Sequence, residues 1–251
     1  MTLDELFRAA ARQAAVAEDT AQRPWPLPEE NWKSAQTWVD LAFLHWRVDA
    51  EKLRPLVPPE LELQTFDGSA YLGIVPFVLS DLRFRGLLPV PGLSTFPELN
   101  VRTCVTLDDR PGVWFFSLDA GSRLMVEGAK RYYKLPYEQA RMRSERIDEF
   151  VHYESARPGA TFSGRYRGEG DLFHAEPGSL EEFLVERYCL YTADGGRLYR
   201  AEVHHAPWAL QHGEAVVDLN TMSPVPLPAE SPHVLFAPRQ DVVVWPLHEV
   251  E

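Results

Sequence analysis

FPELNVRTCV, residues 96–105, alternates apolar and polar side chains in the manner of a β-strand. Successive side chains of a strand point to opposite faces. One face would therefore be largely apolar, and the other would carry Glu98, Asn100 and Arg102. In an open sheet this polar face would be solvated, whereas in a closed barrel it would line an interior cavity. The kind of sheet that this strand joins therefore decides whether these side chains meet water or a ligand.

The composition is that of a folded, acidic protein. The chain has 251 residues, which is enough for one large domain or two small ones, and 45 % of the residues are hydrophobic. The formal net charge of −12 argues against electrostatic binding to nucleic acid or to an anionic membrane surface. We therefore expect neither nucleic acid nor a membrane as a partner, and leave homo-oligomer formation open.

The N-terminal stretch MTLDELFRAAARQAAVAEDT carries acidic residues early and has no long apolar run. It predicts an amphipathic helix rather than a signal peptide or a transmembrane segment. We expect residues 1–21 to be a helical extension, residues 32–251 to be a single domain, and the protein to be cytoplasmic. The cysteines Cys104 and Cys189 have no CxxC spacing, so we expect neither a disulfide framework nor a cysteine zinc site.

The remaining sequence predicts many short strands. Residues 37–48 and 113–120 are apolar strand candidates, Asp67-Gly68 predicts the turn of a hairpin, and residues 241–247 predict a closing strand. Because strands and helices do not alternate regularly, we expect a mostly antiparallel β architecture with about four helices outside it. The P-loop, GxGxxG, GxSxG and HExxH motifs are absent, which argues against nucleotide enzymes, serine hydrolases and zinc proteases.

Two stretches resemble a known superfamily. RVDAEKLRPLVPPELEL (47–63) and GLSTFPE (92–98) resemble segments of the acetoacetate decarboxylases, in the second of which a glutamate reaches the active site. The whole chain looks like an uncharacterised bacterial branch of that superfamily, domain-of-unknown-function family 2071. The motifs that carry this resemblance occur in order between residues 45 and 208: HWRVD, TFDGSAYLGIVPF, GLSTFPELNVRT, GVWFFSLDA, LPY, RYCLY and EVHHAPW. The resemblance implies a mostly β (β-rich α+β) fold, a cone-shaped antiparallel β-barrel with a few outer helices and a small cavity.

The resemblance also reveals a missing nucleophile. Acetoacetate decarboxylases use a Schiff-base lysine that follows an aromatic–proline pair. The matching stretch here, GAKRYYKLPYEQA (128–140), has Tyr137 at the nucleophile position and Glu138 after it, and neither can form an imine. Lys130 and Lys134 lie nearby and share a helical face. A relocated nucleophile and a solvated helix face therefore both stay open for these two lysines.

Six residues are candidates for the site. Glu98, which matches the family's inward glutamate, and Tyr137 are the catalytic candidates, the first as acid or base and the second as hydrogen-bond donor. Arg102 could bind a ligand carboxylate or neutralise Glu98, and Tyr137 could instead pack at a helix–strand corner. The ligand-binding candidates are Asn100, Arg102, Arg141 and Arg187. For Arg187 a surface ion pair, and for Arg141 an exterior position, remain open alternatives.

No metal or cofactor site is expected. His204 and His205 are adjacent, so on a strand they face opposite sides and cannot share one metal ion.

The expected function follows from these residues. We expect a small anionic oxo or carboxylate molecule to bind in the barrel cavity, with lysine-independent lyase or proton-transfer chemistry and no Schiff-base decarboxylation. The alternative is a non-catalytic small-molecule-binding protein. A third hypothesis is a barrel filled with side chains, in which case the surface or the N-terminal helix would carry the function.

Overall fold

The computed structural model describes residues 2–250. The helical elements are α1 (Leu3–Ala15), η1 (Val16–Glu18), α2 (Ala50–Leu53), η2 (Arg54–Leu56), α3 (Arg123–Tyr133) and α4 (Leu180–Val185). The strands are β1 (Ser34–Val48), β2 (Glu62–Leu63), β3 (Ala70–Phe84), β4 (Phe96–Leu107), β5 (Arg110–Ala120), β6 (Tyr137–Gln139), β7 (Arg141–Ile147), β8 (Phe150–Arg157), β9 (Ala160–Phe173), β10 (Cys189–Asp194), β11 (Arg197–His205), β12 (Leu210–Asn220) and β13 (His233–Val250).

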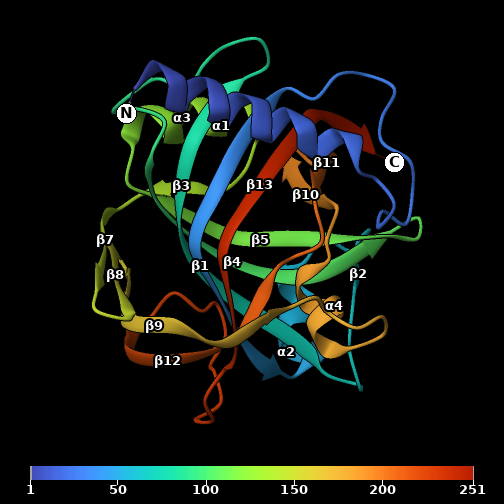
Figure 1. Ribbon diagram of the computed structural model, residues 1–251. Helices are drawn as coiled ribbons and strands as arrows, with labels where there is room; N and C mark the ends of the chain where they lie inside the picture. The colour runs from blue at the N-terminus through green and yellow to red at the C-terminus, as the bar shows by residue number, and fades with distance from the viewer. Residues whose placement is uncertain (1, 251) are drawn as a thin grey trace.

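Seven strands close into a barrel in the order β1-β3-β4-β5-β10-β11-β13, because β13 pairs back onto β1. Figure 1 shows these first and last long strands side by side, blue against red. The pairs are antiparallel except β5 with β10, which is parallel. The predicted β-rich barrel with outer helices is thereby confirmed, and the predicted closing strand at 241–247 lies inside β13.

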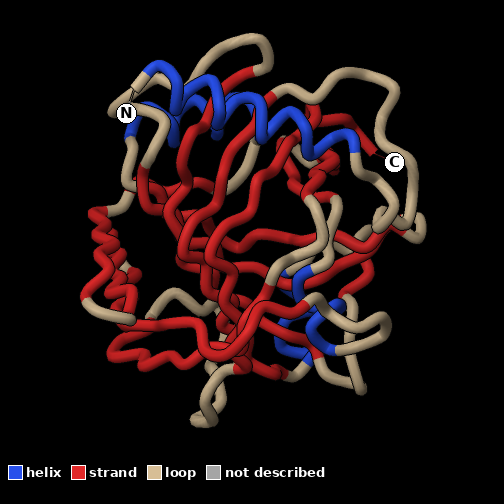
Figure 2. The backbone as a smooth tube through the Cα atoms, in the orientation of Figure 1, coloured by secondary structure: helices blue, strands red, loops and turns tan. Residues whose placement is uncertain are grey.

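Four further strands form an arm outside the barrel, in the order β12-β9-β8-β7, attached where β12 pairs with β13. Figure 2 shows this arm as the strands to the left of and below the barrel. Leu99 and Val101 of β4 pack in the same apolar cluster as Val151 and Tyr153 of the arm. The arm therefore covers the apolar face of β4, and that face does not meet water.

The hairpin predicted at Asp67-Gly68 is only half correct. Both residues have the positive φ angles of a tight turn, 49° and 74°, and a β-bridge joins Phe66 to Ser69. The flanking strands then separate, because β2 pairs with β4 through Glu62↔Thr106 and not with β3. The sequence identified the turn residues, but it did not show that β2 and β3 pair with successive stretches of β4 rather than with each other.

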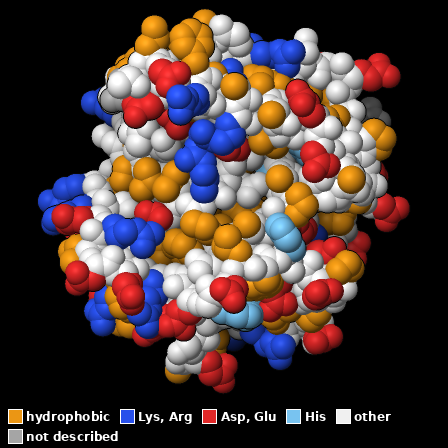
Figure 3. Space-filling model, in the orientation of Figure 1, with side chains coloured by type: hydrophobic (Ala, Val, Ile, Leu, Met, Phe, Trp, Pro, Cys, Tyr) orange, Lys and Arg blue, Asp and Glu red, His pale blue; other side chains and the backbone are white. Residues whose placement is uncertain are grey.

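The N-terminal helix α1 begins with a capping box in which Thr2 and Glu5 exchange hydrogen bonds. Its buried Gln13 donates hydrogen bonds to Thr37 and to the backbone of Asp81, which attaches the helix to β1 and β3. Figure 3 shows this side of the molecule, with acidic and basic side chains interspersed. None of the helices among residues 2–250 is long and apolar enough to cross a membrane.

Candidate functional site

The barrel encloses a cavity of about 650 Å³. Of its described lining residues, only Phe84, Gly128, Arg131 and Tyr132 are exposed, and all four lie at the end covered by α3. We call these four residues the mouth. Figure 1 shows α3 near the top of the molecule and α4 near its lower right side, so the two helices cover different parts of the barrel.

The polar face of β4 lines this cavity. Glu98, Asn100 and Arg102 all contribute to its wall, so the alternation in the sequence corresponds to an inward face. The β4–β5 register shifts between Val101 and Arg102, which indicates a β-bulge, yet Arg102 still lines the cavity. Along β4 the lining order from the mouth inwards is Phe96, Glu98, Asn100 and Arg102.

Glu98 is a buried carboxylic acid with few hydrogen bonds that would stabilise its charged form. Its side chain is 3 % exposed, and burial raises its pKa from 4.5 to about 8. Hydrogen bonds from Tyr137 and Asn100 oppose this shift, and the Tyr137 hydroxyl donates to Oε2 across 3.2 Å. Glu98 is therefore mostly protonated at neutral pH, with a minor carboxylate population that can accept a proton.

Two arginines lie at the inner end of the cavity, beside the C-terminus of α4. Arg102 donates to the Leu184 carbonyl across 3.1 Å, and Arg187 donates to the Phe183 carbonyl. Burial, together with the smaller effect of the nearby Arg187, lowers the pKa of Arg102 to about 10, so Arg102 remains charged at neutral pH. We call Arg102 and Arg187 the arginine pair.

The arginine pair has spare hydrogen-bonding capacity. Within residues 2–250, no ion pair joins either arginine to a carboxylate. The buried Arg187 Nε and the buried Asn100 Oδ1 have no hydrogen-bond partner in the same part of the chain. An unpaired buried guanidinium is costly, and the unpartnered Arg187 Nε leaves a hydrogen-bond donor free at the inner end of the cavity. Arg187 is 8 % exposed, which removes the surface ion pair considered for it.

His205 and Cys189 also line the cavity, but neither is a promising reactant. The His205 ring lies 4.7 Å from that of Tyr188 and 5.1 Å from that of Trp208, centroid to centroid. Burial lowers the pKa of His205 and raises the pKa of Cys189 to about 12. The imidazole is thus neutral and packed, and the sulfur is an inert thiol.

The lysines lie outside this site. Lys134 pairs with Asp194, and Lys130 lies 3.7 Å from Glu138 at the surface. Lys33 and Lys52 are exposed, and none of the four lysines is among the described lining residues. Tyr137, at the position of the family's nucleophile, does line the cavity.

Arg141 is not brought to the cavity with the other candidates. It is exposed on β7, and Ala140 separates β7 from β6, which holds Tyr137. The inward alternation that reaches Tyr137 therefore does not continue to Arg141. We assign Arg141 no part in the site.

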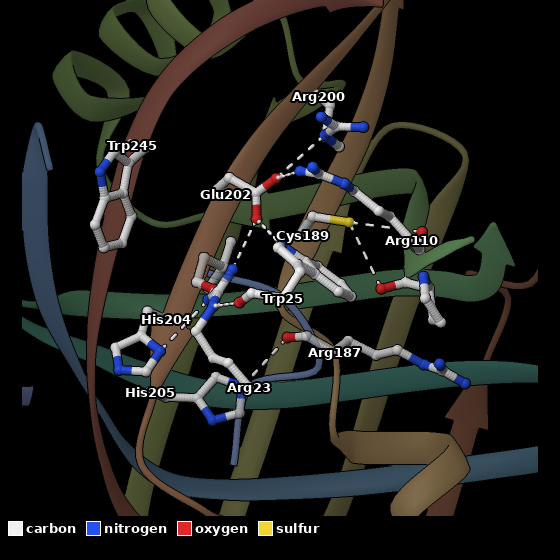
Figure 4. Close-up of polar contacts among 12 residues, drawn as sticks. Arg23, Trp25, Arg110, Arg187, Cys189, Arg200, Glu202, His204, His205 and Trp245 are labelled. Atoms are coloured by element: carbon white, nitrogen blue, oxygen red, sulfur yellow. Dashed lines mark hydrogen bonds and ion pairs between the residues drawn. The ribbon is translucent and has the colours of Figure 1, made fainter. Parts of the chain in front are cut away.

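Sequence reasoning missed a second polar cluster, shown in Figure 4. Glu202 of β11 accepts hydrogen bonds from Arg23 and Trp25, and lies 3.0 Å from Arg110 and 3.2 Å from Arg200. These contacts bind the segment before β1 to the barrel wall. The only sequence signal was the aromatic and basic character of QRPW at residues 22–25, which does not specify a partner.

The adjacent histidines face opposite sides, as the strand geometry predicts. His204 Nε2 lies 3.0 Å from the Val16 carbonyl and 2.9 Å from the Asp19 carbonyl, outside the barrel, while His205 lines the cavity. Across the described residues, no group of three or more His, Cys, Asp or Glu side chains is arranged to hold a metal ion.

The closed barrel has the fold of the acetoacetate decarboxylase-like proteins. The enduracididine biosynthesis enzyme MppR, solved with pyruvate, superposes with a TM-score of 0.64 over 92 % of this chain and 93 % of its own, at 12 % identity. An acetoacetate decarboxylase-like enzyme from Sphingomonas wittichii RW1 gives 0.60 at 14 % identity, covering 92 % and 98 % of the two chains. Acetoacetate decarboxylase from Legionella pneumophila gives 0.59 at 11 % identity, covering 92 % and 94 %. At these identities the likeness shows the fold.

Within that class, the chain belongs to the DUF2071 family, described as "Uncharacterized conserved protein", which matches residues 35–241. The uncharacterized protein YqjF of Bacillus subtilis (strain 168) is 43 % identical over 240 residues, covering 93 % of this chain and 99 % of that protein. The family resemblance stated from the sequence motifs is confirmed.

Proposed function

We propose that the protein binds a small oxo acid in the barrel and transfers a proton at the carbon beside its carbonyl group, without forming an imine. The observation that carries this proposal is the arginine pair, charged and without a carboxylate partner among the described residues, in one cavity with Glu98. The arginine pair would hold the ligand carboxylate by charge-assisted hydrogen bonds. Glu98 lies four residues nearer the mouth than Arg102 on β4, beyond Asn100, where the rest of the ligand would extend.

The chemistry follows from the pKa of Glu98. A general acid–base works best when its pKa lies near the working pH, and the pKa of Glu98 is about 8. As carboxylate, Glu98 would remove a proton from the carbon beside the carbonyl and leave an enolate. As the resulting acid, it would exchange this proton with solvent and then protonate the enolate carbon. The Tyr137 hydroxyl, which donates to Glu98, would stabilise the carboxylate form.

The fold neighbours support the substrate class. One MppR structure is described as complexed with pyruvate, and another with the condensation product of pyruvate and imidazole 4-carboxaldehyde. In both descriptions the bound molecule is the oxo acid pyruvate or is formed from it. The lysines of this chain lie outside the cavity, which supports a mechanism without an imine.

The decisive experiment measures exchange of the methyl protons of pyruvate in D₂O by ¹H NMR. Wild-type protein should catalyse the exchange, and Glu98→Gln should lose about 10²-fold or more of the rate. In parallel, borohydride is added to protein with pyruvate, and the intact mass should show no adduct. A lysine adduct would overturn the imine-free mechanism.

Binding is tested separately by calorimetry. Arg102→Gln and Arg187→Gln should each weaken pyruvate binding by roughly 10- to 100-fold, because a hydrogen bond to a charged group is lost. Arg141→Gln is the matched control, because Arg141 is exposed and lies outside the cavity. This variant should bind pyruvate with the affinity of the wild type. If all three variants bind pyruvate like wild type, the arginine pair is not the carboxylate site.

A non-catalytic binding protein is the second candidate. The family description names no activity, and the lysine nucleophile position holds Tyr137. Pyruvate binding that depends on the arginine pair, without proton exchange above the Glu98→Gln background, would favour this candidate.

A further inference from the structure

The cavity is much larger than a small oxo acid requires. Its volume is about 650 Å³, and a water molecule takes about 30 Å³ in the liquid. The space thus corresponds to roughly 20 water-sized groups. Pyruvate held by the arginine pair would leave most of this volume unfilled.

The unfilled part is apolar. Between Glu98 and the mouth the wall includes the aromatic and aliphatic side chains Trp38, Leu79, Phe96 and Val244. Two of the four mouth residues, Phe84 and Tyr132, are also aromatic, and are 47 % and 40 % exposed. Transfer of apolar surface out of water is favourable, so an apolar wall of this kind favours binding of an apolar ligand group.

The polar and apolar parts are arranged in sequence along the cavity. On β4 the distance from Phe96 to Arg102 corresponds to six residues, or about 20 Å of strand. Both arginines lie at the inner end, Glu98 lies between, and the apolar wall continues outward. One elongated ligand can therefore contact all three regions at once.

We propose that the ligand is an amphipathic oxo acid, with its carboxylate on the arginine pair and an alkyl or aryl chain along the apolar wall toward the mouth. This inference rests on the proposed function, since it uses the same carboxylate site. It adds the substrate class: an oxo acid with on the order of 10–20 non-hydrogen atoms, matched to the cavity volume.

The test is a homologous series of 2-oxo acids titrated into the full chain by calorimetry. The series runs from pyruvate through 2-oxohexanoate and 2-oxooctanoate to 2-oxodecanoate, with phenylpyruvate as the aryl member. Each added methylene should tighten Kd about three- to fourfold until the chain reaches the mouth. The methyl ester of 2-oxooctanoate, which lacks the charge, should bind at least tenfold more weakly than the acid.

A variant locates the chain within the cavity. Ala129 of α3 is half-buried and lines the cavity beside the mouth. Ala129→Trp should abolish the gain with chain length and leave pyruvate binding unchanged. Glu127→Trp is the matched control, because Glu127 lies on the same helix, is exposed and does not line the cavity.

The outcomes separate the two proposals. Equal Kd values for pyruvate and 2-oxooctanoate would overturn the amphipathic ligand and leave the proposed function standing. A gain with chain length that Ala129→Trp does not remove would overturn the placement of the chain. If the ester bound as tightly as the acid, the carboxylate site would be overturned, and with it the proposed function. The same conclusion would follow if none of the acids bound.

Discussion

At the scale of single residues, Glu98 should make stability depend on pH. Its pKa is about 8 in the folded protein and near 4.5 when unfolded. Between these values the unfolded chain loses its proton more readily, so the free energy of unfolding falls as pH rises from about 4.5 to 8. The loss should be about 1.4 kcal/mol per pH unit and on the order of 4–5 kcal/mol in total.

The Glu98→Gln variant removes this ionisation. It should be more stable than wild type at pH 8, and the difference should disappear as pH falls toward 4.5. Urea unfolding at pH 5, 6.5 and 8 measures it, with the exposed Glu127→Gln as control. Equal stability of Glu98→Gln and wild type at pH 8 would contradict a buried, proton-binding Glu98.

Tyr137 acts on the same proton through its hydroxyl. Because the Tyr137 hydrogen bond favours the Glu98 carboxylate, Tyr137→Phe should raise the pKa of Glu98 above about 8. The pH profile of pyruvate proton exchange should then move to higher pH, while the rate at its plateau changes less. A variant that lowers the rate equally at every pH would instead assign Tyr137 a packing role.

At the scale of elements, the contacts of Glu202 hold the chain before β1 against β11. Glu202→Gln would leave Arg23, whose side chain is 1 % exposed, without its carboxylate. Removing one partner of a buried ion pair costs about 3–5 kcal/mol. We expect thermal unfolding of Glu202→Gln to begin at clearly lower temperature, whereas Glu249→Gln, in the exposed pair with Arg197, should match wild type.

The strands differ in how much of their orientation and pairing could be predicted from the sequence. Alternation separated the polar from the apolar face of β4, because successive side chains of a strand point to opposite faces. Only the resemblance to a barrel family turned the polar face inward. β2 pairs with β4, and β6 and β7 on either side of Ala140 pair with different strands, β5 and β8. These pairings join segments that are separate in the sequence, so no local pattern predicts them. For the same reason Arg141 was grouped with Tyr137, although the structure separates them.

The candidate site could be predicted from the sequence only in part, because some of its residues are far apart in the chain. Glu98, Asn100 and Arg102 occupy one short stretch, so their common orientation follows from spacing. Arg187 reaches the same cavity from the segment after α4, and its position depends on where that helix packs. The Glu202 cluster joins residues nearly 180 positions apart, and no spacing rule could have assembled it.

At the scale of the whole molecule, the net charge of −12 opposes the approach of an anionic ligand. The mouth helix differs locally: α3 carries Arg123, Lys130 and Arg131 against the single acid Glu127. We expect Arg131→Glu to slow pyruvate association several-fold at low salt, with convergence to wild type at high salt. Stopped-flow measurements test this, with Arg143→Glu on β7 as control.

The pairing of β1 with β13 has a consequence for how the protein is made. The strand that begins the barrel cannot bind its last neighbour until nearly the entire chain has been synthesised. Until then β1 presents an unpaired edge, and the cavity has no closed wall. A chain that ends before residue 233 lacks β13, and would therefore have neither a closed barrel nor the cavity wall that β13 contributes.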